Sequence, residues 1–172
     1  MTLAIFTSGN LNALDLAIRR GEDIGLLVSN NDLSREVSKY NLEFYMYRED
    51  DELLRKLSEK NVKNIVLSGY NKLVSEKVFR QYKDRIFNIH HSLLPNHSGK
   101  GMYGLNVLKS SIDSGDEKTG FTIHKVEGDY DVGEVVFQKS FDLRTKDPEE
   151  LFEEMLSFEQ KHLPLFFETL RR

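Results

Sequence analysis

The stretch Phe87-Asn88-Ile89-His90-His91-Ser92-Leu93-Leu94-Pro95 decides how this chain is interpreted. It places an amide, Asn88, and an imidazole, His90, two residues apart at the end of an apolar run. In a β-strand, residues i and i+2 point to the same face, so we expect both side chains to project together. A hydrogen-bond donor beside a proton acceptor suits acyl-type transfer at a carbonyl. The motif alone does not exclude the alternative that His90 has only a structural role and packs at the end of a strand.

The composition is that of a globular protein and excludes several classes of function. The 172 residues are 39% hydrophobic and 30% charged, and a net charge of -4 gives no basic surface for nucleic acid. The absence of cysteine excludes disulfides, zinc-thiolate sites and a thiol nucleophile. The N-terminal apolar run is too short for a signal peptide or a membrane helix. We therefore expect one domain over residues 1–172, a cytoplasmic location, and no membrane or nucleic-acid partner.

In the first half of the chain, short apolar runs alternate with segments of helical spacing, which is typical of a mostly parallel sheet flanked by helices. The expected strands are 3–6, 24–28, 43–46, 64–68 and one that ends at 88–90. Helices are expected from Leu11 to about Gly21, from Asp50 and Asp51, either of which could cap its helix, and after a capping Ser75. Ligands bind such sheets beyond the carboxyl ends of the strands. We expect residues 8–10, 69–72 and 88–90 to lie on that rim.

The second half has a different pattern. Two longer β segments, 119–126 and 134–141, are joined by the acidic, glycine-bearing loop 127–133. Asp147-Pro148-Glu149-Glu150 is a strong helix start, with an acidic N-cap and proline in the first position. The sequence therefore predicts a long final helix, which Pro164 should kink or interrupt.

Five motifs, in order along the chain, resemble the folate-dependent formyltransferases, in particular those that act on glycinamide ribonucleotide. They are 67–74 (L-S-G-Y-N-K-L-V), 88–95 (N-I-H-H-S-L-L-P), 99–104 (G-K-G-M-Y-G), 119–124 (T-G-F-T-I-H) and 131–133 (D-V-G). The resemblance runs from Ile5 to about Pro164. It implies an α/β fold: a single-domain, Rossmann-like formyltransferase fold with a mostly parallel sheet flanked by helices, a C-terminal antiparallel β pair and a long final helix.

The resemblance also implies a reaction and its catalytic residues. A formyl group would pass from 10-formyltetrahydrofolate, the co-substrate, to the amine of glycinamide ribonucleotide in de novo purine (IMP) biosynthesis, with no metal. Asn88, His90 and Asp131 match the family's catalytic trio. Asn88 would donate to the oxyanion, and Asp131 would raise the pKa of His90 and help to relay the proton. For Asp131 alone, a role in stabilising the turn is the alternative.

Binding residues are carried over in the same way. The residues implied to bind the amine or the phosphate are Ser8, Gly9, Asn10, Asn12 and Glu159. Those implied to bind folate are Arg48, Asn71, Lys72, Leu73, Val74, Asn88, Gly128, Asp129, Asp131 and Gly133. Core packing is the alternative for Leu73 and Val74, and an exposed position is the alternative for Glu159.

Two departures from the family pattern leave the acceptor open. The loop Ser8-Gly9-Asn10-Leu11-Asn12 is two residues shorter than the family's phosphate cradle and lacks its second glycine. His91 stands where these transferases usually carry proline and resembles formyltetrahydrofolate deformylases, which are hydrolases. Transfer to a different amine, a catalytically silent folate binder and a homodimer also stay open.

His97 is expected to be exposed to solvent, and the 100–104 loop is flexible enough for a lid.

Overall fold

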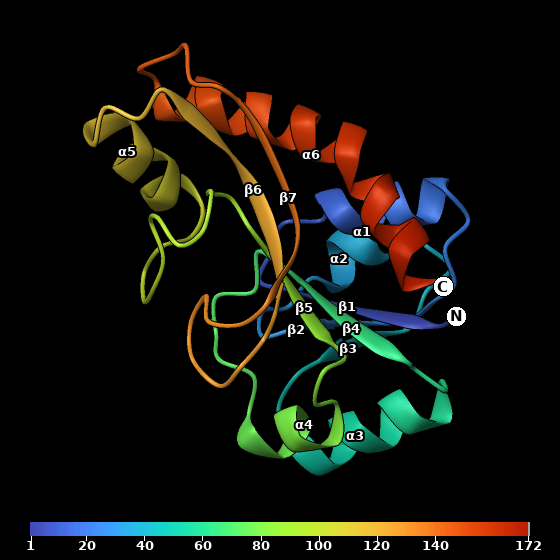
Figure 1. Ribbon diagram of the computed structural model, residues 1–172. Coiled ribbons are helices and arrows are strands. Elements are labelled where there is room, and N and C mark those ends of the chain that lie inside the picture. Colours follow the sequence, from blue (N-terminus) through green and yellow to red (C-terminus); the bar gives the residue numbers. More distant parts are fainter. Residues whose placement is uncertain (172) are drawn as a thin grey trace. The chain divides into compact units, whose positions relative to one another are not determined.

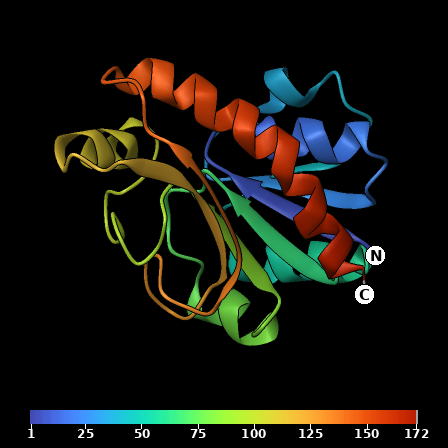
Figure 2. The same cartoon turned by 45° about the horizontal axis from the view of Figure 1, so that its top comes forward.

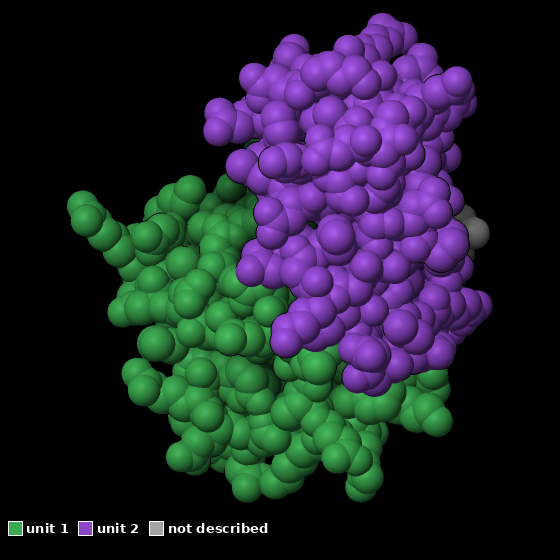
Figure 3. Space-filling view, turned by 90° about the vertical axis from the view of Figure 1, so that its left-hand side faces the viewer, with its two compact units in different colours: residues 1–87 green, residues 88–172 purple. Residues whose placement is uncertain are grey.

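The computed structural model describes residues 1–171 and has the fold class expected from the sequence. It is an α/β structure with parallel strands, a C-terminal antiparallel pair and a long final helix (Figure 1). The chain divides into two compact units, Met1–Phe87 and Asn88–Arg172, which Figure 3 colours separately. The expectation of one domain over 1–172 stays a prediction.

The first unit contains four parallel strands in the order β3-β2-β1-β4. Their bounds are β1 Leu3–Thr7, β2 Ile24–Ser29, β3 Phe44–Met46 and β4 Asn64–Ser68. The helices are α1 Asn12–Arg19, α2 Ser34–Val37, α3 Asp50–Glu59 and α4 Glu76–Gln81. Figure 1 shows α1 and α2 on one face of these strands and α3 and α4 on the other. Helices on both faces explain why every residue of β1 is buried.

Only one of the helix caps predicted for the first unit is found in the structure. Ser75 caps α4 as expected, because its side chain accepts a hydrogen bond from the Val78 N–H. Helix α3 begins at Asp50 instead of being capped by it, with Glu49 at the N-cap position. The three acidic residues of its first turn still face the positive end of the helix dipole.

The second unit is built on the end of β5 and on a long antiparallel hairpin. Strand β5 spans Ile86–His90 and therefore crosses the boundary between the units. The hairpin strands are β6 Lys118–Lys125 and β7 Val135–Asp142, paired from Lys118 opposite Asp142 onward. The helices are α5 Leu105–Asp113 and α6 Pro148–Leu170. Helix α6 packs on β6 and on α5 (Figure 2).

Helix α6 starts as the sequence predicts, but it is not interrupted. The Asp147 side chain accepts hydrogen bonds from the N–H groups of Glu149 and Glu150, and Pro148 occupies the first turn. Of the two expected effects of Pro164, the interruption is wrong, because the helix continues to Leu170, while the kink stays a prediction. Proline removes one backbone hydrogen bond, and the buried side chains beside it, Leu163, Phe166 and Phe167, hold the helix through packing.

Replacing Asp147 with alanine should destabilise the protein by about 1 kcal/mol, because two backbone N–H groups at the start of α6 lose their acceptor. Urea unfolding monitored by circular dichroism measures the change. Asp147→Ser should keep most of the stability, since serine also caps helices. Equal stability of the alanine variant and the unchanged protein would contradict this role of Asp147.

Candidate functional site

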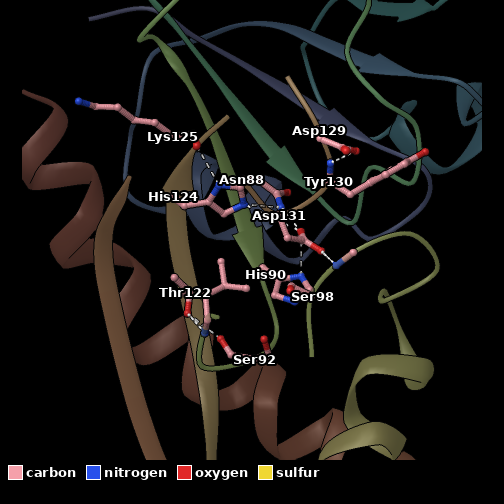
Figure 4. Close-up of polar contacts among 12 residues, drawn as sticks. Asn88, His90, Ser92, Ser98, Thr122, His124, Lys125, Asp129, Tyr130 and Asp131 are labelled. Carbon is pink, nitrogen blue, oxygen red and sulfur yellow. Dashed lines mark hydrogen bonds and ion pairs between the residues drawn. The ribbon is translucent and has the colours of Figure 1, made fainter. Parts of the chain in front are cut away.

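Asn88 and His90 both contact Asp131 in the second unit (Figure 4). Asn88 and His90 point to one side of β5, as their spacing predicts. Asn88 Nδ2 donates to Asp131 Oδ1 at 3.2 Å, and His90 Nδ1 lies 3.2 Å from the same oxygen. The side chains of His90 and Asp131 are 5% and 8% exposed, so this pair is largely shielded from water.

Asp131 lies on the loop 127–133, and its position depends on a close approach between the backbone at Gly133 and the backbone at Lys125. Glu127 N–H donates to the carbonyl of Val132, which closes the loop on itself. At Gly133, a Cβ atom would lie 1.8 Å from the carbonyl oxygen of Lys125. Only glycine fits at position 133, because any side chain would overlap this oxygen. The D-V-G motif therefore has a steric reason for its glycine in addition to the proposed chemical role of Asp131.

His90 is held as one tautomer by its backbone partner. Its Nε2 lies 2.8 Å from the carbonyl oxygen of His97, and because a carbonyl can only accept, Nε2 must carry a proton. In the neutral imidazole, Nδ1 is then the unprotonated nitrogen, and it faces Asp131. Proton uptake by this side chain therefore occurs at Nδ1, beside a carboxylate that stabilises the resulting charge.

The pKa of His90 lies below its ordinary value, although Asp131 acts on it in the direction expected from the sequence. Burial lowers the pKa because the charged form loses water, and this effect is larger than the opposing effect of Asp131. The Asp131 carboxylate does raise the pKa of His90, as predicted, but it does not reverse the net direction. At neutral pH, His90 is therefore uncharged and able to accept a proton.

Asn88 is oriented by His124, on β6. His124 Nδ1 lies 2.9 Å from the Lys125 carbonyl, so Nδ1 carries the proton and Nε2 is an acceptor. Asn88 Nδ2 donates to this Nε2 at 3.1 Å. The two N–H bonds of Asn88 are thus directed at His124 and Asp131, and the amide cannot rotate by half a turn without losing both partners.

The segment that follows β5 is fastened to β6 through Thr122. Its hydroxyl donates to the Ser92 carbonyl at 2.7 Å and accepts from the Leu94 N–H at 3.1 Å (Figure 4 shows Ser92 and Thr122). Thr122 is fully buried, so these bonds are not exposed to competing water. They position the chain beyond His90 relative to the strand that carries His124.

A buried side-chain contact involves the residue that follows His90 in the sequence. His91 Nε2 is 2.6 Å from Glu159 Oε2, and the Glu159 side chain is fully buried on α6. The alternative of an exposed Glu159 is therefore wrong, and the His91 side chain beside it is only 10% exposed. Sequence reasoning did not link the two, which are 68 residues apart.

In the first unit, the predicted phosphate loop forms a network of hydroxyl and amide groups. The Ser8 hydroxyl lies 2.6 Å from Asn30 Oδ1 and 2.8 Å from Asn71 Oδ1, and it accepts from the Asn71 N–H at 3.0 Å. Asn10 Oδ1 accepts from the backbone N–H of Asn12 at 2.9 Å. The structure therefore brings Ser8 and Asn71 together, as expected for two loops on one rim of a parallel sheet.

The remaining predicted binding residues are more exposed. Leu73 is 45% exposed, so core packing as the alternative for Leu73 is wrong, while Val74 is half-buried. Arg48 lies with its guanidinium 3.7 Å from the Met46 sulfur. In the second unit, Asp129 is exposed and accepts from the Tyr130 N–H, and Gly128 has a left-handed φ of 82°. Their assignment to folate stays a prediction.

Within residues 1–171, no three His, Cys, Asp or Glu side chains gather in an arrangement suited to a metal ion. Over the same part of the chain, every helix is either too short or too polar to cross a membrane.

The chain belongs to the formyl transferase family, whose profile matches residues 19–166. It is 39% identical over 111 residues to the chloroplastic phosphoribosylglycinamide formyltransferase of Arabidopsis thaliana, an alignment that covers 64% of this chain and 38% of that protein. The chain therefore spans well under half the length of this relative.

Solved structures share the fold. The phosphoribosylglycinamide formyltransferase of Bacillus halodurans has a TM-score of 0.83 at 26% identity, covering 99% of this chain and 95% of its own. A formyltetrahydrofolate deformylase from Pseudomonas syringae pv. tomato has a TM-score of 0.79 at 22% identity, covering 93% and 57%. The second likeness concerns the fold alone.

The pKa of His90 should lie below 6.5 and should fall further in Asp131→Asn, because the variant loses the charge that raises it. NMR titration of the His90 ring measures both values. Between the folded pKa and 6.5, the unfolded chain binds the additional proton, so stability should decrease as the pH falls through that interval. A folded pKa above 6.5 would contradict the dominant effect of burial.

Gly133→Ala should destabilise the protein more than Gly128→Ala. Both glycines have positive φ, so each alanine carries a strain of about 1–2 kcal/mol. Only at Gly133 does a Cβ also overlap a backbone oxygen, whereas the space around Gly128 is open. Urea unfolding gives the free energy of unfolding of both variants, and the difference between them measures the effect of the overlap at Gly133. Equal losses of stability would refute the steric requirement at Gly133.

Proposed function

We propose that this chain transfers the formyl group of 10-formyltetrahydrofolate to the amine of glycinamide ribonucleotide, in de novo purine biosynthesis. The observation that carries the proposal is the contact of Asn88, His90 and Asp131, which places an amide donor and a neutral imidazole around one buried carboxylate. The named relatives support the choice of acceptor. A cytoplasmic location and the lack of nucleic-acid and membrane partners stay predictions.

The chemistry follows from the hydrogen bonds of the cluster. The acceptor amine attacks the formyl carbon, a carbon–nitrogen bond forms, and the carbonyl oxygen becomes an oxyanion. Asn88 stabilises this oxygen with the N–H that otherwise contacts Asp131, since His124 holds the other N–H. One such preoriented donor lowers a barrier of this kind by about 3 kcal/mol.

The proton follows a path that the tautomer of His90 determines. The attacking amine releases it to His90 Nδ1, where Asp131 stabilises the imidazolium. When the bond between the formyl carbon and folate N10 breaks, that proton passes to N10. The proton count balances, because the amine loses the proton that the folate nitrogen gains, and His90 returns to its neutral form.

Binding of the acceptor's phosphate is assigned to the loop at Ser8, Gly9 and Asn10. The Ser8, Gly9 and Asn10 loop precedes α1, and the backbone N–H groups at a helix start attract anions. The Asn10 side chain already accepts a hydrogen bond from the Asn12 N–H, so a phosphate would compete with this side chain for that donor. In the second unit, Glu159 is engaged by His91, and binding of the substrate amine by Glu159 would require this pair to open.

Hydrolysis of 10-formyltetrahydrofolate is the second candidate, and His91 is the observation that favours it. The same Asn88, His90 and Asp131 would then act on water as the nucleophile. His91 contributes an imidazole in contact with buried Glu159, at a position where the resembling transferases usually have proline.

The decisive experiment follows the loss of 10-formyltetrahydrofolate with and without glycinamide ribonucleotide. Consumption that requires the acceptor and yields its formylated form is expected. Consumption without an acceptor, with release of formate, would replace the transferase by a hydrolase. No consumption in either case would refute both activities for these two substrates.

His90→Ala and Asp131→Asn should each lower kcat by about two to four orders of magnitude, because each removes part of the proton path. Binding of folate, measured by calorimetry, should be retained. Asp113→Asn is a control, since it removes an exposed carboxylate at the end of α5 that has no place in the proposed site. Near-normal turnover in either test variant would remove that residue from the mechanism.

A further inference from the structure

His97 was expected to be exposed, and the structure instead shows it held on both ring nitrogens. Its Nε2 lies 2.7 Å from Asp116 Oδ2, and its Nδ1 lies 2.8 Å from the Ser110 hydroxyl on α5. The His97 side chain is 11% exposed. An ionised Asp116 can only accept, so Nε2–H donates to it, and Nδ1 is hydrogen-bonded to the Ser110 hydroxyl.

The backbone of the same segment contacts the two members of the proton path. The His97 carbonyl accepts from His90 Nε2–H at 2.8 Å, and the Gly99 N–H donates to Asp131 Oδ2 at 2.9 Å. Residues 97–99, which we call the backbone clip, thus hold the imidazole from one side and the carboxylate from the other. Figure 4 shows Ser98, the middle residue of the clip, beside His90 and Asp131.

The clip has a backbone conformation that needs support. His97 has a φ of 52°, in the left-handed region, which is strained for a residue other than glycine. Gly99 also has a positive φ, of 103°. Two side-chain hydrogen bonds at His97 oppose relaxation of this conformation, and they tie the clip to α5 and to the turn that precedes β6.

We propose that His97 is a positioning residue: its side chain, anchored by Asp116 and Ser110, holds the backbone clip that fixes the tautomer of His90 and the orientation of Asp131. This inference rests on the proposed function for its catalytic consequence, though not for its structural one. Without the anchor, the His97 carbonyl leaves His90 Nε2, the imidazole exchanges tautomers, and Nδ1 is no longer always the free base.

Asp116→Ala tests the anchor at a distance from the reacting groups. Its kcat for formyl transfer should fall by about tenfold to a hundredfold, the effect of a misplaced catalytic group, with KM within about twofold. Asp116→Asn should recover much of kcat, because an amide oxygen still accepts from His97. Asp113→Ala is the matched control, since Asp113 is an exposed carboxylate at the end of α5, and it should resemble the unchanged protein.

A double-mutant cycle decides whether Asp116 acts through His97. His97→Gly removes the anchored ring and still permits the positive φ. If the proposal is correct, Asp116→Ala lowers kcat in the unchanged protein and has little further effect in the His97→Gly background. Independent, multiplicative losses from the two substitutions would overturn the proposal.

A spectroscopic measurement separates this inference from the proposed function. ¹⁵N NMR of the imidazole distinguishes protonated from unprotonated ring nitrogens, and it needs neither folate nor an acceptor. The unchanged protein should show His90 with the proton on Nε2, and Asp116→Ala should show a mixture of tautomers while its thermal unfolding remains cooperative. An Nε2–H tautomer that persists in folded Asp116→Ala would overturn the inference, whatever the activity assays give.

Discussion

The hydrogen bond from His90 Nε2–H to the His97 carbonyl determines which nitrogen of the imidazole faces Asp131. A carbonyl offers no proton, so this contact leaves Nδ1 as the basic atom of the neutral ring. Burial then keeps the ring uncharged by lowering its pKa. The proposed proton path depends on both effects, since an imidazole that is already charged, or turned to present Nε2, could not accept a proton beside Asp131.

The rest of the second unit is arranged so that few groups in this cluster can move independently. Gly133 permits the close backbone approach that delivers Asp131, and Thr122 ties the chain after β5 to the strand that carries His124. His124 in turn orients the Asn88 amide. Such hydrogen bonds are stronger out of water, and a partner removed from one of them leaves a buried polar group unsatisfied.

The proposed chemistry and the choice of the proposed acceptor rest on different parts of the chain. The cluster around Asp131 lies wholly in the second unit and suits attack of any nucleophile on a formyl carbon. The features that would select an acceptor are the short loop at Ser8–Asn10 in the first unit and the buried pair of His91 and Glu159 in the second. Differences among family members in the use of an amine or water would therefore be sought at these positions.

The sequence by itself determined the alternation of strands and helices, the shared face of Asn88 and His90, and the N-cap of the final helix, because these follow from local periodicity and from backbone hydrogen-bonding needs. Family motifs added Asp131. Only the tertiary structure decided the tautomer of His90, the direction of its pKa, the link of His91 to Glu159, and the anchoring of His97 by Asp116, because these depend on burial and on contacts between residues distant in sequence. The uninterrupted helix at Pro164 has the same origin, since packing of its neighbours outweighs the local preference of proline.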